Sequence, residues 1–178
     1  MNILKDKKCY MAGGIDRIED SGIQWRINLK NKAIEKGLEI KWLDPCDKPE
    51  WLGSEVGTEK SLTKKLINEG KWQEAREYVK KFRHFDLRAV DISDFMIVKI
   101  DIKTHICGTY DEIFTAEDQL KPILVIMGEG QKKEDIPTWL ISFINEDNIF
   151  ESEDECINYL VKINNGEIKL DDRWVKWF

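Results

Sequence analysis

Long apolar runs are absent from this sequence of 178 residues. No stretch approaches the roughly 20 apolar residues that a helix needs to cross a bilayer, so we expect no transmembrane segment and no membrane partner. The N-terminal stretch MNILKDKKCYMAGG contains lysines but lacks the apolar core of a signal peptide. These absences predict a cytoplasmic protein.

Cysteine and histidine are also scarce. Cys9, Cys46, Cys107 and Cys156 are widely dispersed, and no pair has the spacing of metal ligands. We therefore expect reduced thiols in a cytosolic compartment. With histidine only at positions 84 and 105, a histidine-rich metal site is not expected. The sequence predicts neither a metal nor a cofactor.

Basic residues are fewer than acidic residues: the sequence has 28 lysines and arginines and 34 acidic residues, which gives a net charge of −6. Nonspecific binding to a nucleic acid polymer is therefore not expected. A small anionic ligand is compatible with this charge, because backbone amides and one or two cations can hold a phosphate. A hydrophobic fraction of 42% indicates a globular chain. The length fits one domain over residues 1–178.

The apolar pattern alternates between short strand-like runs and longer helical runs. Strands are predicted at 8–15, 38–45, 95–100, 122–128 and 148–152. Helices are predicted at 20–37, at 61–94 in two or three pieces with Gly70 at the first joint, and at 108–120, 136–144 and 154–164, with a loop at 46–57. This order indicates an α/β fold: one doubly wound, flavodoxin- or Rossmann-like domain with a mostly parallel, five-stranded sheet.

Ligands of doubly wound sheets bind beyond the carboxyl ends of the strands, where the strand order reverses. Three predicted loops follow strands, at 13–20, 44–46 and 101–109. The polar residues of interest collect in these loops, which indicates a site there.

The first of these loops contains Gly13 and Gly14, which let the backbone approach a ligand closely. The pattern is not GxGxxG, so a dinucleotide site is not supported, and a Gly-Gly turn is also common without any ligand. Arg26 opposes the dipole at the start of the next helix, which predicts a partner, either a protein acid or a ligand anion. Trp25 is expected in the core, or as a wall of a base pocket.

Two acids later in the sequence are candidates for chemistry. Asp86 is flanked by Phe85 and Leu87, so we expect partial burial and a pKa raised toward use as a proton donor. Glu112 follows a predicted Gly108-Thr109 turn, in the first turn of a helix. It is either part of a T-x-x-E capping box, bonding the Thr109 amide, or a reagent at the mouth of the sheet.

Three stretches together resemble one family. They are CYMAGGI with DSGIQWR, then FDLRAVDISDFMIVKID, then GTYDEIFTAEDQLKPILVI. In order and spacing this set is similar to the nucleoside 2-deoxyribosyltransferase family, which includes related nucleotide N-glycosidases. The resemblance covers residues 8–128 and fits the later residues more loosely.

The resemblance implies roles for individual residues. Glu112 would attack the anomeric carbon of the sugar, and Asp86 would place the sugar and move protons. A carboxylate of this kind captures C1′ as an ester, which a second base or water then attacks. The residues implied in substrate binding are Tyr10, Gly13, Gly14, Ile15, Asp16, Trp25, Arg26, Asp44, Asp101, Gly108, Thr109 and Met127.

Two positions depart from the family pattern. Gly13-Gly14 stands where the family has glycine-proline, and Ile106 stands where transferases carry an acid that reads the base. Transfer and hydrolysis therefore both stay open, as do the choice of base and of nucleoside or 5′-monophosphate. A non-catalytic nucleotide-binding protein is the alternative.

The resemblance also implies a homodimer or larger homo-oligomer. The aromatic tail DDRWVKWF is expected to take part in assembly or in closing a pocket, or else to fold back over its own domain.

Overall fold

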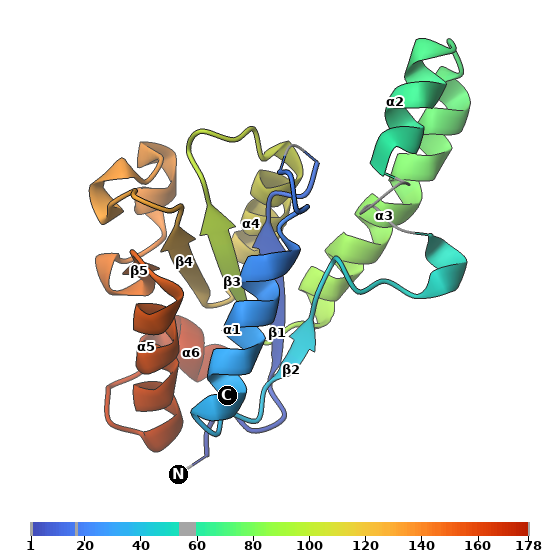
Figure 1. Cartoon of the computed structure of the whole chain (residues 1–178). Coiled ribbons are helices and arrows are strands. Elements are labelled where there is room, and N and C mark those ends of the chain that lie inside the picture. Colours follow the sequence, from blue (N-terminus) through green and yellow to red (C-terminus); the bar gives the residue numbers. More distant parts are fainter. Residues whose placement is uncertain (1, 17, 54–59, 178) are drawn as a thin grey trace.

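The computed structural model describes residues 2–16, 18–53 and 60–177 (Figure 1). The strands are β1 (Lys8–Gly13), β2 (Lys41–Leu43), β3 (Phe95–Ile100), β4 (Ile123–Met127) and β5 (Ile149–Phe150). The helices are α1 (Ile23–Glu35), α2 (Lys60–Asn68), α3 (Trp72–Ile92), α4 (Cys107–Asp118), α5 (Glu153–Asn165) and α6 (Asp172–Trp177). The loop predicted at 46–57 lies outside the described residues from position 54 onward.

The strands form one sheet in the order β2-β1-β3-β4-β5, and all neighbouring strands are parallel. This confirms the predicted doubly wound α/β fold. The chain adds β2 on one side of β1 and then returns to add β3 on the other side, so the strand order reverses at β1. Tyr10 lies at this point, in register with Leu43 of β2 and Met96 of β3. A crevice is expected at the carboxyl ends of these strands.

Helices cover both faces of the sheet (Figure 1). Helices α1 and α5 pack together on one face, and α3 and α4 pack on the other. Cys9 and Met11 belong to the core on the α1 side, whereas Tyr10 and Ala12 belong to the core on the α4 side. This alternation follows from the two-residue period of a strand. It places the Tyr10 side chain on the same face as α4.

Helix α2 and the first part of α3 form an arm that projects from the sheet (Figure 1). Gly70 makes the turn between them with a φ of 75°, as predicted for this joint. The far end of α3 packs on the sheet through Ala89 and Val90. One helix of 21 residues thus connects the arm to the body. Within the described ranges, no helix is both long enough and apolar enough to cross a bilayer.

The later part of the chain differs from the prediction in detail. The helix predicted at 136–144 is instead a 3-10 turn over Thr138–Ser142, a geometry that is common in short connecting segments. The strand predicted at 148–152 is shortened to β5, an edge strand that pairs only with β4. The Ser152 side chain then caps α5.

The aromatic tail folds back onto its own chain. Helix α6 buries Trp174 completely, and its ring centroid lies 5.3 Å from that of Phe95. The fold-back alternative is therefore right for Trp174, and this residue no longer supports a role of the tail in assembly. Phe178 lies outside the described residues.

Candidate active site

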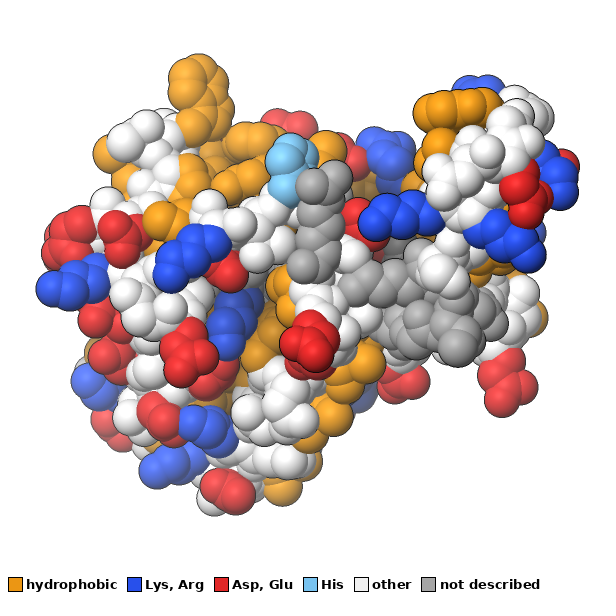
Figure 2. All heavy atoms as spheres, turned by 45° about the horizontal axis from the view of Figure 1, so that its top comes forward, with side chains coloured by type: hydrophobic (Ala, Val, Ile, Leu, Met, Phe, Trp, Pro, Cys, Tyr) orange, Lys and Arg blue, Asp and Glu red, His pale blue; other side chains and the backbone are white. Residues whose placement is uncertain are grey.

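A cleft of about 750 Å³ opens at the carboxyl ends of the strands. One wall is the face of α3 that carries Tyr78, Phe82 and Asp86, and the other walls are the turn after β1 and the start of α4. Figure 2 shows this edge of the molecule, with the sheet body on the left and the arm on the right. The volume is typical of small-molecule sites, which span roughly 300–1,000 Å³.

Glu112 lines this cleft from α4. The helix begins at Cys107 with Ile106 as an N-cap that makes no side-chain bond, so Glu112 lies in the second turn. Glu112 Oε1 instead accepts a hydrogen bond of 2.7 Å from the Tyr10 hydroxyl. The capping-box interpretation is therefore wrong, and Gly108 lies inside the helix, not in a turn before it.

The surroundings of Glu112 change its acidity. Burial raises its pKa from 4.5 to about 8, and the hydrogen bond from Tyr10 acts in the opposite direction. The negative charge of Asp86 raises this pKa further, whereas the positive charges of Arg26 and Lys48 lower it. Burial also raises the pKa of Tyr10 well above its ordinary value, so its hydroxyl stays a donor. Glu112 thus loses its proton only in mildly alkaline solution.

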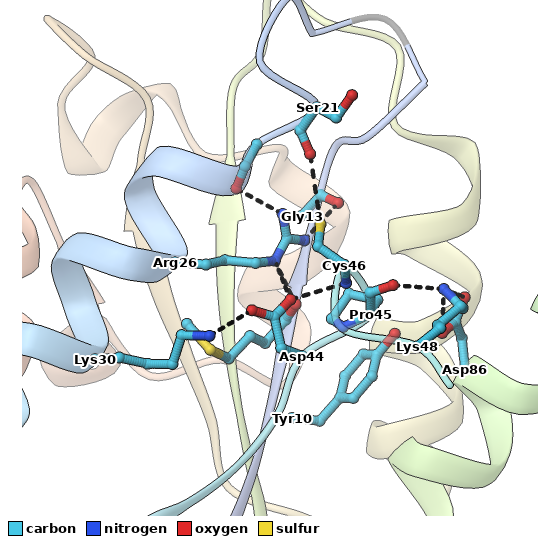
Figure 3. Close-up of polar contacts among 12 residues, drawn as sticks. Tyr10, Gly13, Ser21, Arg26, Lys30, Asp44, Pro45, Cys46, Lys48 and Asp86 are labelled. Atoms are coloured by element: carbon cyan, nitrogen blue, oxygen red, sulfur yellow. Dashed lines mark hydrogen bonds and ion pairs between the residues drawn. The ribbon is translucent and has the colours of Figure 1, made fainter. Parts of the chain in front are cut away.

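Asp86 is only 8% exposed, so the expected partial burial is confirmed. Its carboxylate faces Lys48, whose Nζ lies 2.9 Å from Oδ1 and 3.0 Å from Oδ2 (Figure 3). Lys48 also donates to the Pro45 carbonyl at 2.7 Å. Sequence reasoning missed Lys48, because a lysine between Asp47 and Pro49 in a polar loop is typical of an exposed residue. No local pattern in the sequence signals its burial.

Gly13, Gly14, Ile15 and Asp16 line the cleft where the chain leaves β1. A Cβ on Gly14 would lie 2.7 Å from the Ile18 side chain, so glycine lets this turn pack tightly.

Gly22 is the N-cap of α1 and has a φ of 68°. A Cβ at this position would lie 2.6 Å from the Gly14 carbonyl oxygen. The Asp20 carboxylate accepts hydrogen bonds from the amides of Gly22 and Gln24 at the start of this helix.

Arg26 stabilises the turn after β1 through buried hydrogen bonds. It has no exposed surface, and its guanidinium donates to the carbonyls of Met11, Gly22 and Gly13 at 3.2, 2.9 and 3.1 Å. Asp44 Oδ1 lies 3.6 Å from Arg26 Nε. The partner expected for Arg26 is thus a protein acid together with backbone carbonyls. Such burial does not support direct contact between Arg26 and a substrate.

The Asp44 carboxylate is also bound by groups of the protein itself. It pairs with Lys30 at 2.7 Å and accepts from the Cys46 amide at 2.9 Å (Figure 3). The side chain is 8% exposed. Asp44 therefore fixes the loop after β2 and joins it to the turn after β1 through Arg26.

Gly108 and Thr109 form the remaining wall of the cleft, in the first turn of α4. No acidic side chain occupies that turn. Its free amides and the positive end of the helix dipole therefore lie at the cleft.

Three predicted substrate-binding residues lie elsewhere. Trp25, Asp101 and Met127 line a second cleft of about 630 Å³ beside α1 and α5. Gly14 and Ile106 line both clefts and lie between them. These three residues therefore do not line the cleft that contains Glu112, and their role in substrate binding stays a prediction.

The sequence matches no protein-family model and no curated protein. Among solved structures, the fold is similar to that of a 2-deoxyribosyltransferase from the psychrotolerant bacterium Bacillus psychrosaccharolyticus. The TM-score is 0.55 at 17% sequence identity, over 85% of this chain and 91% of that chain. At this identity the similarity shows the fold, with its parallel sheet covered on both faces.

Proposed function

We propose that the protein is an enzyme that cleaves the N-glycosidic bond of a deoxynucleoside or a deoxynucleoside 5′-monophosphate, with Glu112 as the nucleophile. The observation that carries this proposal is the environment of Glu112. This residue lines the cleft at the point where the strand order reverses, and its carboxyl accepts a hydrogen bond of 2.7 Å from the Tyr10 hydroxyl. A perturbed acid in such a cleft is typical of a reactive group. The fold shared with a 2-deoxyribosyltransferase supports the substrate class.

In the proposed reaction, the ionised Glu112 carboxylate attacks C1′ of the sugar while the C1′–N bond breaks. The electrons of that bond leave with the base, which takes up a proton, and the sugar stays as an ester of Glu112. Attack by a second base transfers the sugar, and attack by water releases it. Burial disfavours the charged carboxylate, so formation of a neutral ester relieves a desolvation penalty.

The neighbouring groups have supporting roles in this proposal. Tyr10 orients the Glu112 carboxyl. A carboxylate that faces a buried ammonium is held in its charged form, so the Lys48 contact favours sugar placement over proton donation as the role of Asp86. The amides around Gly14 and Gly108 would hold the sugar or a 5′-phosphate.

We also expect the protein to form a homodimer or a larger homo-oligomer. Trp51, Trp72 and Trp139 are 79%, 65% and 77% exposed, and an assembly would remove such surfaces from water. Light scattering at micromolar concentration measures the assembly directly. A monomer under these conditions would contradict the expectation.

The test of the proposed function is incubation with a panel of deoxynucleosides and their 5′-monophosphates, followed by chromatography for free base. We expect release by the wild type and none by Glu112→Gln. Addition of a second base distinguishes transfer, which yields a new nucleoside, from hydrolysis. Ligand binding without base release from any member of the panel would favour the alternative, a protein that sequesters nucleotides.

A further inference from the structure

Lys48 brings a buried positive charge next to Asp86, which lines the first cleft. Its side chain is 2% exposed, and its Nζ lies 2.9 and 3.0 Å from the two oxygens of Asp86. The ammonium also lies 5.5 Å from the centre of the Phe82 ring. Removal of one member of such a pair leaves the other as a buried, uncompensated charge. Lys48 and Asp86 therefore act together.

The fold fixes the position of this ammonium. Figure 3 shows a chain of contacts that runs from Arg26 to Asp44 and through the loop after β2 to Lys48. Arg26 Nε lies 3.6 Å from Asp44, and the Pro45 carbonyl accepts from Lys48 at 2.7 Å. The same Arg26 donates to the turn after β1. The ammonium is thus held by groups that also shape the cleft.

Glu112 lines the same cleft as Asp86, the acidic member of this ion pair. Burial raises the pKa of Glu112 most strongly and the charge of Asp86 raises it further, whereas the hydrogen bond from Tyr10 and the charges of Arg26 and Lys48 lower it. Two carboxylates in one desolvated cleft oppose each other's ionisation, and a neighbouring cation offsets this effect. Without the Lys48 charge, ionisation of Glu112 beside Asp86 would need a higher pH.

We propose that Lys48 is a positioning residue for the proposed reaction: its ammonium fixes the Asp86 carboxylate at the wall of the cleft and balances its charge, so that Glu112 can ionise beside it. This inference rests on the proposed function for its chemical meaning. The charge balance itself exists with or without a substrate. It can therefore be measured separately from activity.

The charge balance is measured from the pH dependence of urea unfolding. The difference in unfolding free energy between wild type and Glu112→Gln changes with pH where Glu112 titrates, and so gives the midpoint of that titration. The same comparison in a Lys48→Met background should place the midpoint at a higher pH. In an Asp86→Asn background, which keeps the ammonium, the midpoint should move lower. An unchanged midpoint in either background would overturn the proposal.

Two further variants control this experiment. Lys48→Arg keeps the charge and should keep the midpoint close to the wild-type value. Lys99→Met removes a half-buried lysine that pairs with Glu153 at 2.7 Å in the second cleft, and should leave the midpoint unmoved. A change of midpoint as large in Lys99→Met as in Lys48→Met would show a general effect of lost lysines and would overturn the proposal.

Activity gives the second readout. On a substrate that the wild type turns over, Lys48→Met should lower kcat about 100-fold and move the acidic limb of the pH profile upward. Lys48→Arg, which keeps the charge, should have its acidic limb at the wild-type position. A folded Lys48→Met protein with an unmoved limb would show a merely structural role. If the wild type releases no base from any substrate, the proposed function fails, and the unfolding midpoints still decide the role of Lys48.

Discussion

Replacement of Glu112 by glutamine should stabilise the folded protein at alkaline pH. Burial raises the pKa of Glu112 to about 8 in the folded state, against an ordinary value of 4.5. Above that pH the folded protein must hold a carboxylate in a poorly hydrated cleft. Glutamine has the same shape, keeps an oxygen that can accept from the Tyr10 hydroxyl, and stays neutral throughout.

The sign and size of the effect follow from proton binding. Between pH 4.5 and about 8, folded wild type holds a proton on Glu112 that the unfolded chain has released. The free energy of unfolding therefore falls as pH rises through this window, by at most about 1.36 kcal/mol for each pH unit. A pKa raised from 4.5 to about 8 corresponds to a total on the order of 4–5 kcal/mol. Lys121, whose pKa burial lowers to about 8, titrates equally in both proteins and cancels.

The assay is urea unfolding of wild type and Glu112→Gln from about pH 5 to about pH 9. We expect nearly equal stability at the acidic end and several kcal/mol in favour of glutamine at the alkaline end. Asp111→Asn is a matched control on the same helix, because Asp111 is 43% exposed and pairs with Arg83 at the surface. Its effect should not vary with pH in this window. If the difference in unfolding free energy between wild type and Glu112→Gln does not change with pH, the inference that Glu112 is a buried carboxyl with a raised pKa is refuted.

Two further predictions concern the surroundings of the site, and a third concerns the docked C-terminal tail. Tyr10→Phe removes the hydrogen bond that lowers the pKa of Glu112, so the acidic limb of the pH profile of base release should move to higher pH. Turnover at neutral pH should then fall about tenfold for each pH unit by which the limb moves. An unchanged pH profile would contradict this role of Tyr10. Asp86→Asn should lower both turnover and melting temperature, because it leaves the Lys48 ammonium buried without its carboxylate, at about 3–5 kcal/mol. The double variant Asp86→Asn/Lys48→Met should recover the melting temperature in calorimetry but not the turnover. Trp174→Ala should lower the free energy of unfolding by about 3–5 kcal/mol in urea, because the ring is fully buried, and a loss below ~1 kcal/mol would show that the tail is not docked in solution.

The fold could be predicted because its signals are local. The apolar run FMIVKI indicates a strand covered on both faces, and the Gly70 joint marks the break between α2 and α3. The start of α4 could not be read in the same way. Thr109 and Glu112 match a capping box, yet the helix begins earlier, at Cys107, and Ile106 is buried at its N-cap. Tertiary packing, not a side-chain cap, sets that boundary.

The candidate site was predictable only in part. Glu112 and Asp86 reach one cleft, as the resemblance implied, but Trp25 and Met127 line the other. Which cleft a loop residue faces depends on how the chain packs at the sheet edge, and the sequence pattern does not contain this information.

The Lys48–Asp86 ion pair could not be predicted from the sequence either. It joins residues 38 positions apart. For this reason Asp86→Asn is expected to change stability as well as turnover.

The most direct test of a covalent mechanism is to trap the sugar on Glu112. Wild type is mixed with a substrate that it turns over and quenched in acid during turnover. The digested protein is then examined by mass spectrometry for the peptide that contains Cys107–Asp118. Nucleophilic attack by Glu112 predicts one deoxyribosyl group on that residue, no such adduct on Glu112→Gln, and no base release by that variant. Base release by folded Glu112→Gln at the wild-type rate, or a sugar attached to a different residue, would contradict it.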